Sequence, residues 1–338
     1  MSLKRIFAAA ALVFIAAGHE ADAEALKVRV GVIPVVGASP LFVADKEGWL
    51  KKDGLDLAIK VFQSGPNLVQ AAASGDIDLY VAGVAPVAVG RSKNIDLRVV
   101  TASAVDENVL VAGADLKSYF KPGVSAAAAF AAFHKATGHP VKIATQPPGS
   151  VPQTNLQYWL REVAKVDLAD VQIVAIGIDA TQQALLAKAV DAATVREPTL
   201  TVIEERDPTV GILAKGEELF PGQPGTVVAV YGPFATAHPE AVQAIVNGIV
   251  KAVAELKTDP DRAAPAVDAA LSKGIIPAAT IRKSLASPAV NFVADPKAIE
   301  KATEAFLAYQ VKLGVLKSAP SLNGLFDESY YAKAAAQN

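Results

Sequence analysis

The apolar positions of the chain alternate between two spacings. Short runs rich in β-branched residues are each followed by a loop of glycine, proline or serine, and then by a stretch with apolar residues at helical spacing. In the first third of the chain the runs cover residues 26–33, 57–62, 77–82 and 96–102. This repeated strand, loop and helix order predicts a parallel sheet with helices on its faces.

A second run of the same kind follows. We expect strands at residues 108–113, 141–145, 171–176 and 191–195, with helices between them. After about residue 206 the pattern is mainly helical and interrupted by prolines, with one more strand at 226–231. The pattern predicts two α/β lobes: residues 24–107 in lobe I, 108–204 in lobe II, and 205–338 returning to lobe I as a helical C-terminal region.

Residues 1–23 have the order of a secretory signal peptide. Lys4 and Arg5 precede an apolar run at 6–17, which is too short to span a bilayer, and Ala21-Asp22-Ala23 fits a cleavage site. We expect export by the general secretion route with cleavage after Ala23; the alternative is an ordinary buried helix. Without a cysteine to carry a lipid, the exported protein is expected to be free in a periplasm.

Composition removes several classes of function. Lys plus Arg is 32 and Asp plus Glu is 34, a net charge of −2 that argues against a nucleic-acid partner. The absence of cysteine excludes disulfides, thiolate metal sites and cysteine nucleophiles. The four histidines lack metal-ligand spacing, and the sequence has no G-x-S-x-G, P-loop or G-x-G-x-x-G motif. We therefore expect no enzyme activity, no cofactor and no metal.

Four loops that follow predicted strands are the candidate ligand site. In parallel sheets ligands bind beyond the C-terminal strand ends, where helix N-termini offer free N–H groups to an anion. The alternative is that these glycines and serines only cap their helices. The candidate residues in the loops are Gly37, Ala38, Ser39, Gln63, Ser64, Gly65, Gly83, Val84, Ala85, Gly149 and Ser150.

Three further positions, Arg196, Glu197 and Tyr231, extend this candidate ligand site. Arg196, followed by Glu197 at the end of the strand at 191–195, has the fork geometry to clamp a carboxylate or sulfonate; the alternative is an Arg–Glu ion pair at the rim. Tyr231, at the end of the strand at 226–231, offers a ring and a hydroxyl group to a ligand, or is a core tyrosine.

Three segments carry a family resemblance. Residues 39–59 (SPLFVADKEGWLKKDGLDLAI), 70–100 and 178–198 together resemble periplasmic binding proteins of the nitrate/sulfonate/taurine, or NMT1-like, group. The resemblance implies a type II periplasmic binding fold: two α/β lobes joined by two crossover segments, with the ligand in the cleft between them. It implies the permease and ATPase of an ABC importer as partners, and adds Val151 to the candidate residues.

The sequence departs from the family pattern at Arg196, where a tryptophan is common; this favours direct pairing with an anion. The metal site of bicarbonate- and nitrate-type members and the cysteine motif of pyrimidine-precursor members have no counterpart. We expect a monomeric solute-binding protein that closes on a small sulfonate or carboxylate about crossovers near Asp106 and Glu204. The alternatives are an enzyme on the same fold, acting on a small carboxylate or pyrimidine-type precursor, and a binding module that feeds a sensor.

Overall fold

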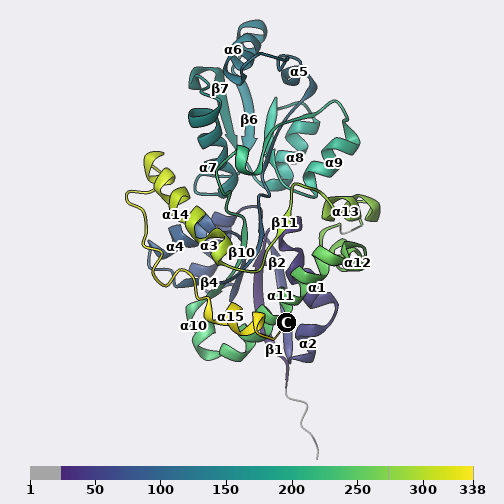
Figure 1. Ribbon diagram of the computed structural model, residues 1–338, viewed down its shortest axis with the longest axis vertical. Helices are drawn as coiled ribbons and strands as arrows, with labels where there is room; N and C mark the ends of the chain where they lie inside the picture. Colours follow the sequence, from purple (N-terminus) through teal and green to yellow (C-terminus); the bar gives the residue numbers. More distant parts are fainter. Residues whose placement is uncertain (1–23, 273, 338) are drawn as a thin grey trace, which may run out of the picture.

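The computed structural model describes residues 24–272 and 274–337 as two α/β lobes, one above the other in Figure 1. The predicted signal peptide lies outside the described residues. Lobe I holds a six-stranded sheet in the order β11-β4-β10-β3-β1-β2, and lobe II a five-stranded sheet in the order β7-β6-β8-β5-β9. The expected two-lobed fold is confirmed.

Lobe I is built on three parallel strands, β1, β2 and β3, and on β10, which runs antiparallel between β3 and β4. Its strands are β1 (Leu26–Val32), β2 (Leu55–Val61), β3 (Leu79–Gly83), β4 (Leu97–Val105), β10 (Thr226–Tyr231) and β11 (Asn291–Phe292). Its helices are η1 (Val36–Ala38), α1 (Ser39–Lys46), α2 (Trp49–Lys52), α3 (Gly65–Ala73), α4 (Val84–Arg91), α10 (Gly232–Ala237), α11 (Pro239–Thr258), α12 (Pro260–Leu271), α13 (Ala278–Leu285), α14 (Lys297–Lys312) and α15 (Ser329–Ala335).

Lobe II has β6 parallel to both β7 and β8, while β5 runs antiparallel to β8 and β9. Its strands are β5 (Val109–Ala112), β6 (Val141–Thr145), β7 (Val171–Ala175), β8 (Ala192–Val195) and β9 (Gly211–Lys215). Its helices are α5 (Ala114–Lys117), α6 (Ala126–Thr137), α7 (Val151–Tyr158), η2 (Trp159–Val163), η3 (Leu168–Asp170), α8 (Ile178–Leu186) and α9 (Thr199–Arg206); η4 (Gly216–Glu218) follows β9.

The second crossing between the lobes lies later in the chain than the sequence pattern indicates. β9 pairs with β5 in lobe II, so the chain returns to lobe I over residues 216–225 rather than near Glu204, which is in α9. The first crossing is at 106–108, as expected. The boundary at 204 is corrected to about 215 because β9 is recognised only through its pairing with a strand about a hundred residues earlier.

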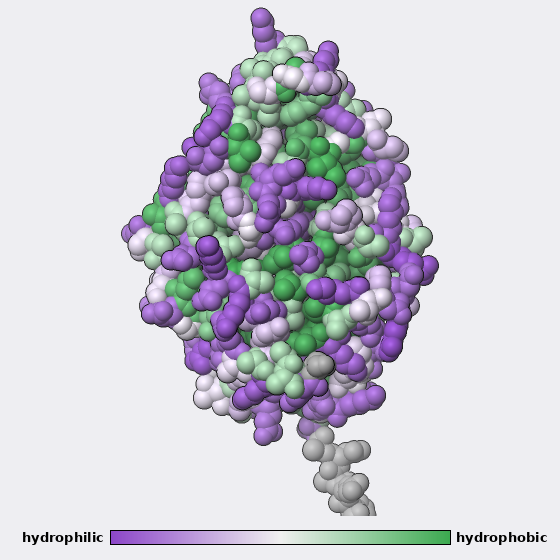
Figure 2. All heavy atoms as spheres, in the orientation of Figure 1, coloured by the Kyte–Doolittle hydropathy of each residue, from purple (hydrophilic) through white to green (hydrophobic). Residues whose placement is uncertain are grey.

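Lobe I has one large apolar core, lobe II has two, and a fourth apolar cluster joins residues of both lobes. Ala85 of α4 and Val151 of α7 pack there with Phe220 of the second crossing and with Phe306 and Tyr309 of α14. Polar side chains cover both lobes on the face in Figure 2, and apolar groups show between them near the middle of the molecule.

In the described residues no helix is both long and apolar enough to cross a membrane.

The C-terminal region places one helix against each flank of lobe II (Figure 1). On one side Thr280 of α13 donates its hydroxyl to Glu205 of α9 over 2.6 Å. On the other, Gln310 of α14 donates from Nε2 to Thr154 Oγ1 of α7 over 3.0 Å. Helices α13 and α14 therefore connect lobe I to lobe II outside the two crossings.

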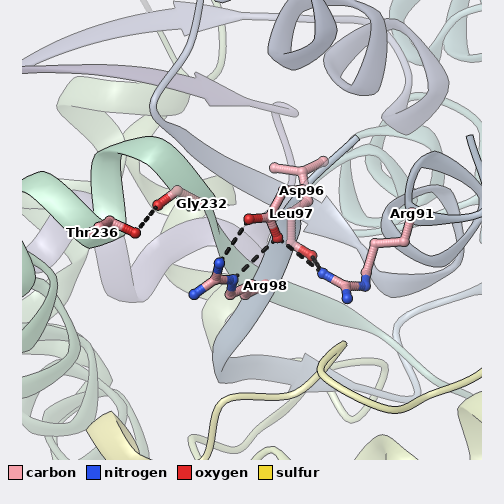
Figure 3. Close-up of polar contacts among 6 residues, drawn as sticks. All are labelled: Arg91, Asp96, Leu97, Arg98, Gly232 and Thr236. Carbon is pink, nitrogen blue, oxygen red and sulfur yellow. Dashed lines mark hydrogen bonds and ion pairs between the residues drawn. The ribbon is translucent and has the colours of Figure 1, made fainter. Parts of the chain in front are cut away.

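Asp96 fixes the start of β4 to the elements around it (Figure 3). Its carboxylate accepts hydrogen bonds from Arg98 Nη2 at 2.7 Å and Arg91 Nη1 at 3.1 Å. The bond from Arg98 is the main cause that lowers the pKa of Asp96. A Cβ at Gly232 would lie 1.8 Å from Asp96 Oδ2. The first residue of α10 is therefore glycine because this anchored carboxylate occupies the space.

Replacing Gly232 with alanine should lower the free energy of unfolding by about 1–3 kcal/mol, because the carboxylate can yield only by leaving its arginine partners. Urea unfolding followed by circular dichroism measures the loss. In a double-mutant cycle, Asp96→Ala should recover part of it, since the obstructing oxygen is gone. Strictly additive losses would contradict this account.

Candidate functional site

The C-terminal ends of the parallel strands in the two lobes face each other. On the lobe I side they lead into η1, Gln63 and Gly83; on the lobe II side they lead into the loops before α7, α8 and α9. The loops are in direct contact: the Val36 N–H donates to the Glu197 carbonyl over 2.8 Å, and Gly83 packs against Val151. The structure thus brings the predicted loops of both lobes together, with the lobes closed on each other.

Arg196 places a buried guanidinium at this junction. The residue is only 4% exposed, and its Nε donates to Asn108 Oδ1 over 3.1 Å. Its Nη2 lies 3.7 Å from where a Cβ of Gly83 would stand, and its Nη1 has no hydrogen-bond partner among the described residues. Burial lowers the pKa of Arg196, and the charge of Glu107 partly offsets the effect. The junction therefore holds a cation with a free N–H group.

Glu107 is the buried carboxylate of the junction. Its Oε2 accepts from both the backbone N–H and the hydroxyl of Thr226, each at 2.7 Å. Burial raises the pKa of Glu107, while Arg196 acts in the opposite direction. A Cβ at Gly37 would lie 1.7 Å from Glu107 Oε1. Gly37 is therefore needed to admit the Glu107 carboxylate, which joins the first crossing to β10.

A small enclosed cavity lies beside Arg196. Its volume is only about 10 Å³, which is about the space that one water molecule needs. The polar groups that line it are hydroxyl and amide groups and the charged side chain of Arg196. The lining residues are Val35, Gln146, Ile178, Thr181, Thr194, Val195, Arg196 and Thr199. Thr181 already donates its hydroxyl to the Gly177 carbonyl, and Thr194 shares a hydrogen bond with Thr145, so Arg196, Gln146 and Thr199 are the lining groups that could donate to an anionic group.

Several other polar side chains at the starts of the facing helices are buried without a partner among the described residues. Ser39 and Ser64, both predicted site residues, have hydroxyl groups of this kind in lobe I. In α7 of lobe II, Gln153 Oε1 and both side-chain polar atoms of Asn155 are likewise buried without a hydrogen-bond partner among the described residues. Because unpaired buried polar groups are costly, these positions are suited to bind water or a ligand.

Other predicted residues have structural roles. Ser150 caps α7 by accepting from the Gln153 N–H at 3.4 Å, which is the alternative role considered for that loop. Gly65 leaves space for the Tyr80 hydroxyl, 2.9 Å from where its Cβ would stand. Ala38, Val84 and Ala85 are buried, and the Gly149 carbonyl accepts from Gln310 at 3.5 Å.

Two predicted roles are corrected. Glu197 does not pair with Arg196: its carboxylate accepts from the N–H and hydroxyl of Thr201, each at 3.0 Å, and so holds the first turn of α9; burial raises its pKa. Tyr231 is at the far end of lobe I. Because β10 is antiparallel to β3, its first residue, Thr226, lies opposite Gly83, whereas Tyr231 pairs with Leu97.

Sequence reasoning missed several groups of the junction. Asn108 and Gln146 directly flank short apolar strands at the ends that face lobe I, and a polar residue in that place is a signal that could have identified them. Tyr80 gave no such signal, because it lies inside a buried strand; its hydroxyl donates to the Gly83 carbonyl over 2.7 Å.

Comparisons with known proteins agree with this architecture. A curated relative from Brucella abortus (strain 2308), provisionally named a binding protein, is 27% identical over 252 residues, covering 74% of this chain and 73% of the relative. The nitrate-binding protein NrtA from Synechocystis PCC 6803 superposes with a TM-score of 0.77 at 18% identity, over 93% of this chain and 89% of that one.

The alkanesulfonate-binding protein SsuA from Xanthomonas axonopodis pv. citri, bound to MOPS, gives a TM-score of 0.70 at 21% identity, over 90% of this chain and 99% of that one. At these identities the likeness establishes the two-lobed fold of the periplasmic binding proteins. Residues 21–271 match the model of the NMT1-like family, and the chain therefore belongs to that family.

Proposed function

We propose that this chain is the periplasmic solute-binding component of an ABC importer and that it binds a small organic anion, a sulfonate or a carboxylate. The observation that carries the proposal is the buried guanidinium of Arg196 with its free Nη1, at the junction where the strand ends of both lobes meet.

An anion is the ligand that this environment favours. A charge taken out of water is costly unless it is paired, and within the described part of the chain the one hydrogen bond seen for Arg196 is to a neutral amide, Asn108. The buried carboxylate of Glu107 is engaged by Thr226 through Oε2, and its Oε1 has no hydrogen-bond partner among the described residues. A carboxylate or sulfonate would pair with the remaining guanidinium face and accept from Gln146 and Thr199 beside it.

Capture requires the lobes to separate. The cavity beside Arg196 has the volume of about one water molecule, so an organic acid enters only when lobe II moves away from lobe I. The crossings at 106–108 and 216–225 are the segments about which this motion would occur. The ligand stabilises the closed form only to the extent that it binds that form more tightly.

Relatives support a transport role. The compared structures include an alkanesulfonate-binding protein, a nitrate-binding protein and the ligand-binding component of an ABC-type import system from Staphylococcus aureus. These are binding proteins, which favours binding over catalysis. Secretion with cleavage after Ala23, a monomeric state, and delivery to permease and ATPase subunits belong to the same proposal.

A thermal-shift screen of residues 24–338 tests the ligand class. A sulfonate or carboxylate at about 100 times its dissociation constant should stabilise the protein by about 2.7 kcal/mol, because it binds only the folded state. Sugars and cationic amines serve as comparison compounds. A clear shift with one of these and none with any acid would contradict the anion proposal.

Replacing Arg196 with alanine should weaken binding of the most effective acid by about thirtyfold or more, since truncating one partner of a buried charge pair costs about 2 kcal/mol or more. Arg196→Lys should be intermediate, because it keeps the charge but loses the fork. Titration calorimetry measures both. Arg161→Ala is the matched control, since this arginine is exposed and bonded to Gln157. Unchanged affinity of Arg196→Ala would remove it from the site.

Replacing Gly83 with alanine should hold the lobes apart. Its φ of −60° suits alanine, but the new Cβ would lie 2.8 Å from Val151 Cγ2 of lobe II. Small-angle X-ray scattering should show a larger radius of gyration and unchanged helix content by circular dichroism. Val151→Ala in the same chain should reverse the expansion; a radius equal to the wild type in Gly83→Ala would refute the prediction.

A further inference from the structure

We propose that Gln63 of lobe I caps helix α8 of lobe II, and that this contact lets the protein itself stabilise the closed arrangement of its lobes. The inference goes beyond the proposed function by assigning part of the closure energy to the chain instead of the ligand. It rests on that function only for the role of closure in transport.

Gln63 makes three hydrogen bonds to the first turn of α8. Its backbone carbonyl accepts from the Ile178 N–H at 3.3 Å, and its side-chain Oε1 accepts from the Asp179 N–H at 3.0 Å. Its Nε2 donates to Asp179 Oδ2 at 2.9 Å. The first N–H groups of a helix have no partner within the helix, so one residue of lobe I satisfies two of them.

Lobe II does not supply this cap itself. The residue before α8 is Gly177, which has no side chain, and no side-chain cap is present there. A Cβ at Gly177 would lie 2.9 Å from the Cβ of Gln63. The usual capping residues, serine and aspartate, are thus excluded at position 177 by the same residue of lobe I that replaces their function.

An apolar contact between the lobes adds to the hydrogen bonds of Gln63. Ile178, the first residue of α8, is 7% exposed and packs with the core cluster of lobe I. When the lobes separate, this side chain enters water together with the two uncapped N–H groups. Opening therefore carries a cost that is independent of any ligand.

This arrangement gives Gln63 a different role from the one its sequence position predicts. The position of the loop after β2 predicts contact with the ligand; instead its glutamine binds the opposite lobe directly. Gln63 is thus a positioning residue, which acts on ligand affinity through the population of the closed form.

Distance measurements on the ligand-free protein test the proposal. The chain has no cysteine, so Gln70→Cys in α3 and Gln183→Cys in α8 accept one spin label each. Pulsed electron paramagnetic resonance then gives the fraction of closed molecules. Gln63→Ala should lower the closed-to-open ratio by up to about tenfold, since two side-chain hydrogen bonds, both exposed to solvent, are lost.

A reversal of the hydrogen-bond direction separates capping from general packing. Gln63→Glu should open the lobes at pH 7.5, because its second oxygen meets the Asp179 carboxylate and neither group can donate. Adding Asp179→Asn should restore the closed fraction, since the asparagine amide can donate to the new carboxylate at position 63. Asp179→Asn alone keeps a usable acceptor and should remain closed.

Gly177→Ser is a third variant that tests the proposal. Its φ of −74° suits serine, which should cap α8 within lobe II while its side chain displaces Gln63. We expect open lobes with a thermal unfolding temperature no lower than that of the wild type, a combination that a purely structural role for Gly177 would not give.

Three results would overturn the proposal. They are a wild type that is open without ligand, a Gln63→Ala variant with unchanged distances, and a failure of Asp179→Asn to rescue Gln63→Glu. Because no ligand is added, these outcomes stay distinct from failure to bind an acid.

Discussion

The junction between the lobes depends on one buried charge. The Arg196 residue is only 4% exposed, so its guanidinium is a charge held largely out of bulk water. Asn108 accepts from one N–H, and Glu107 supplies a negative charge from the first crossing. Arg196 also lines the small cavity at the junction, and its Nη1 has no hydrogen-bond partner among the described residues, so the chemistry of the proposed site depends on this one residue.

Much of the fold could be predicted from local pattern. Alternating strands and helices indicated the parallel strands of each sheet, although both sheets also contain antiparallel pairs that the pattern did not indicate. The rule that ligands bind at C-terminal strand ends pointed to the loops at 37–39, 63–65 and 83–85, which lie at the junction. Arg196 was identified for the same reason, because it directly follows β8. These features are encoded within a few residues of where they act, so one sequence is enough to find them.

The misplaced features depend on pairing between distant strands. β10 has the same apolar pattern in either direction, so only its antiparallel pairing with β3 reveals that Thr226, and not Tyr231, lies at the junction end of the strand. β9 has an ordinary composition, and its place in lobe II is fixed by β5. Likewise, the space at Gly37 is occupied by Glu107, about seventy positions later, which no local signal indicates.

The two crossings are themselves joined, through the fully buried side chain of Gln223 in the second. Its Oε1 accepts from the backbone N–H and side-chain amide of Asn108, at 2.7 and 3.0 Å, and its Nε2 donates to the Gly216 carbonyl at 2.8 Å. These hydrogen bonds fix the two crossings to each other, so a movement of one segment would carry the other with it. A residue inserted into either segment would shift it against its cross-linked partner, so the lengths of the two segments are tied to each other, and changes tolerated in an ordinary surface loop would be costly here.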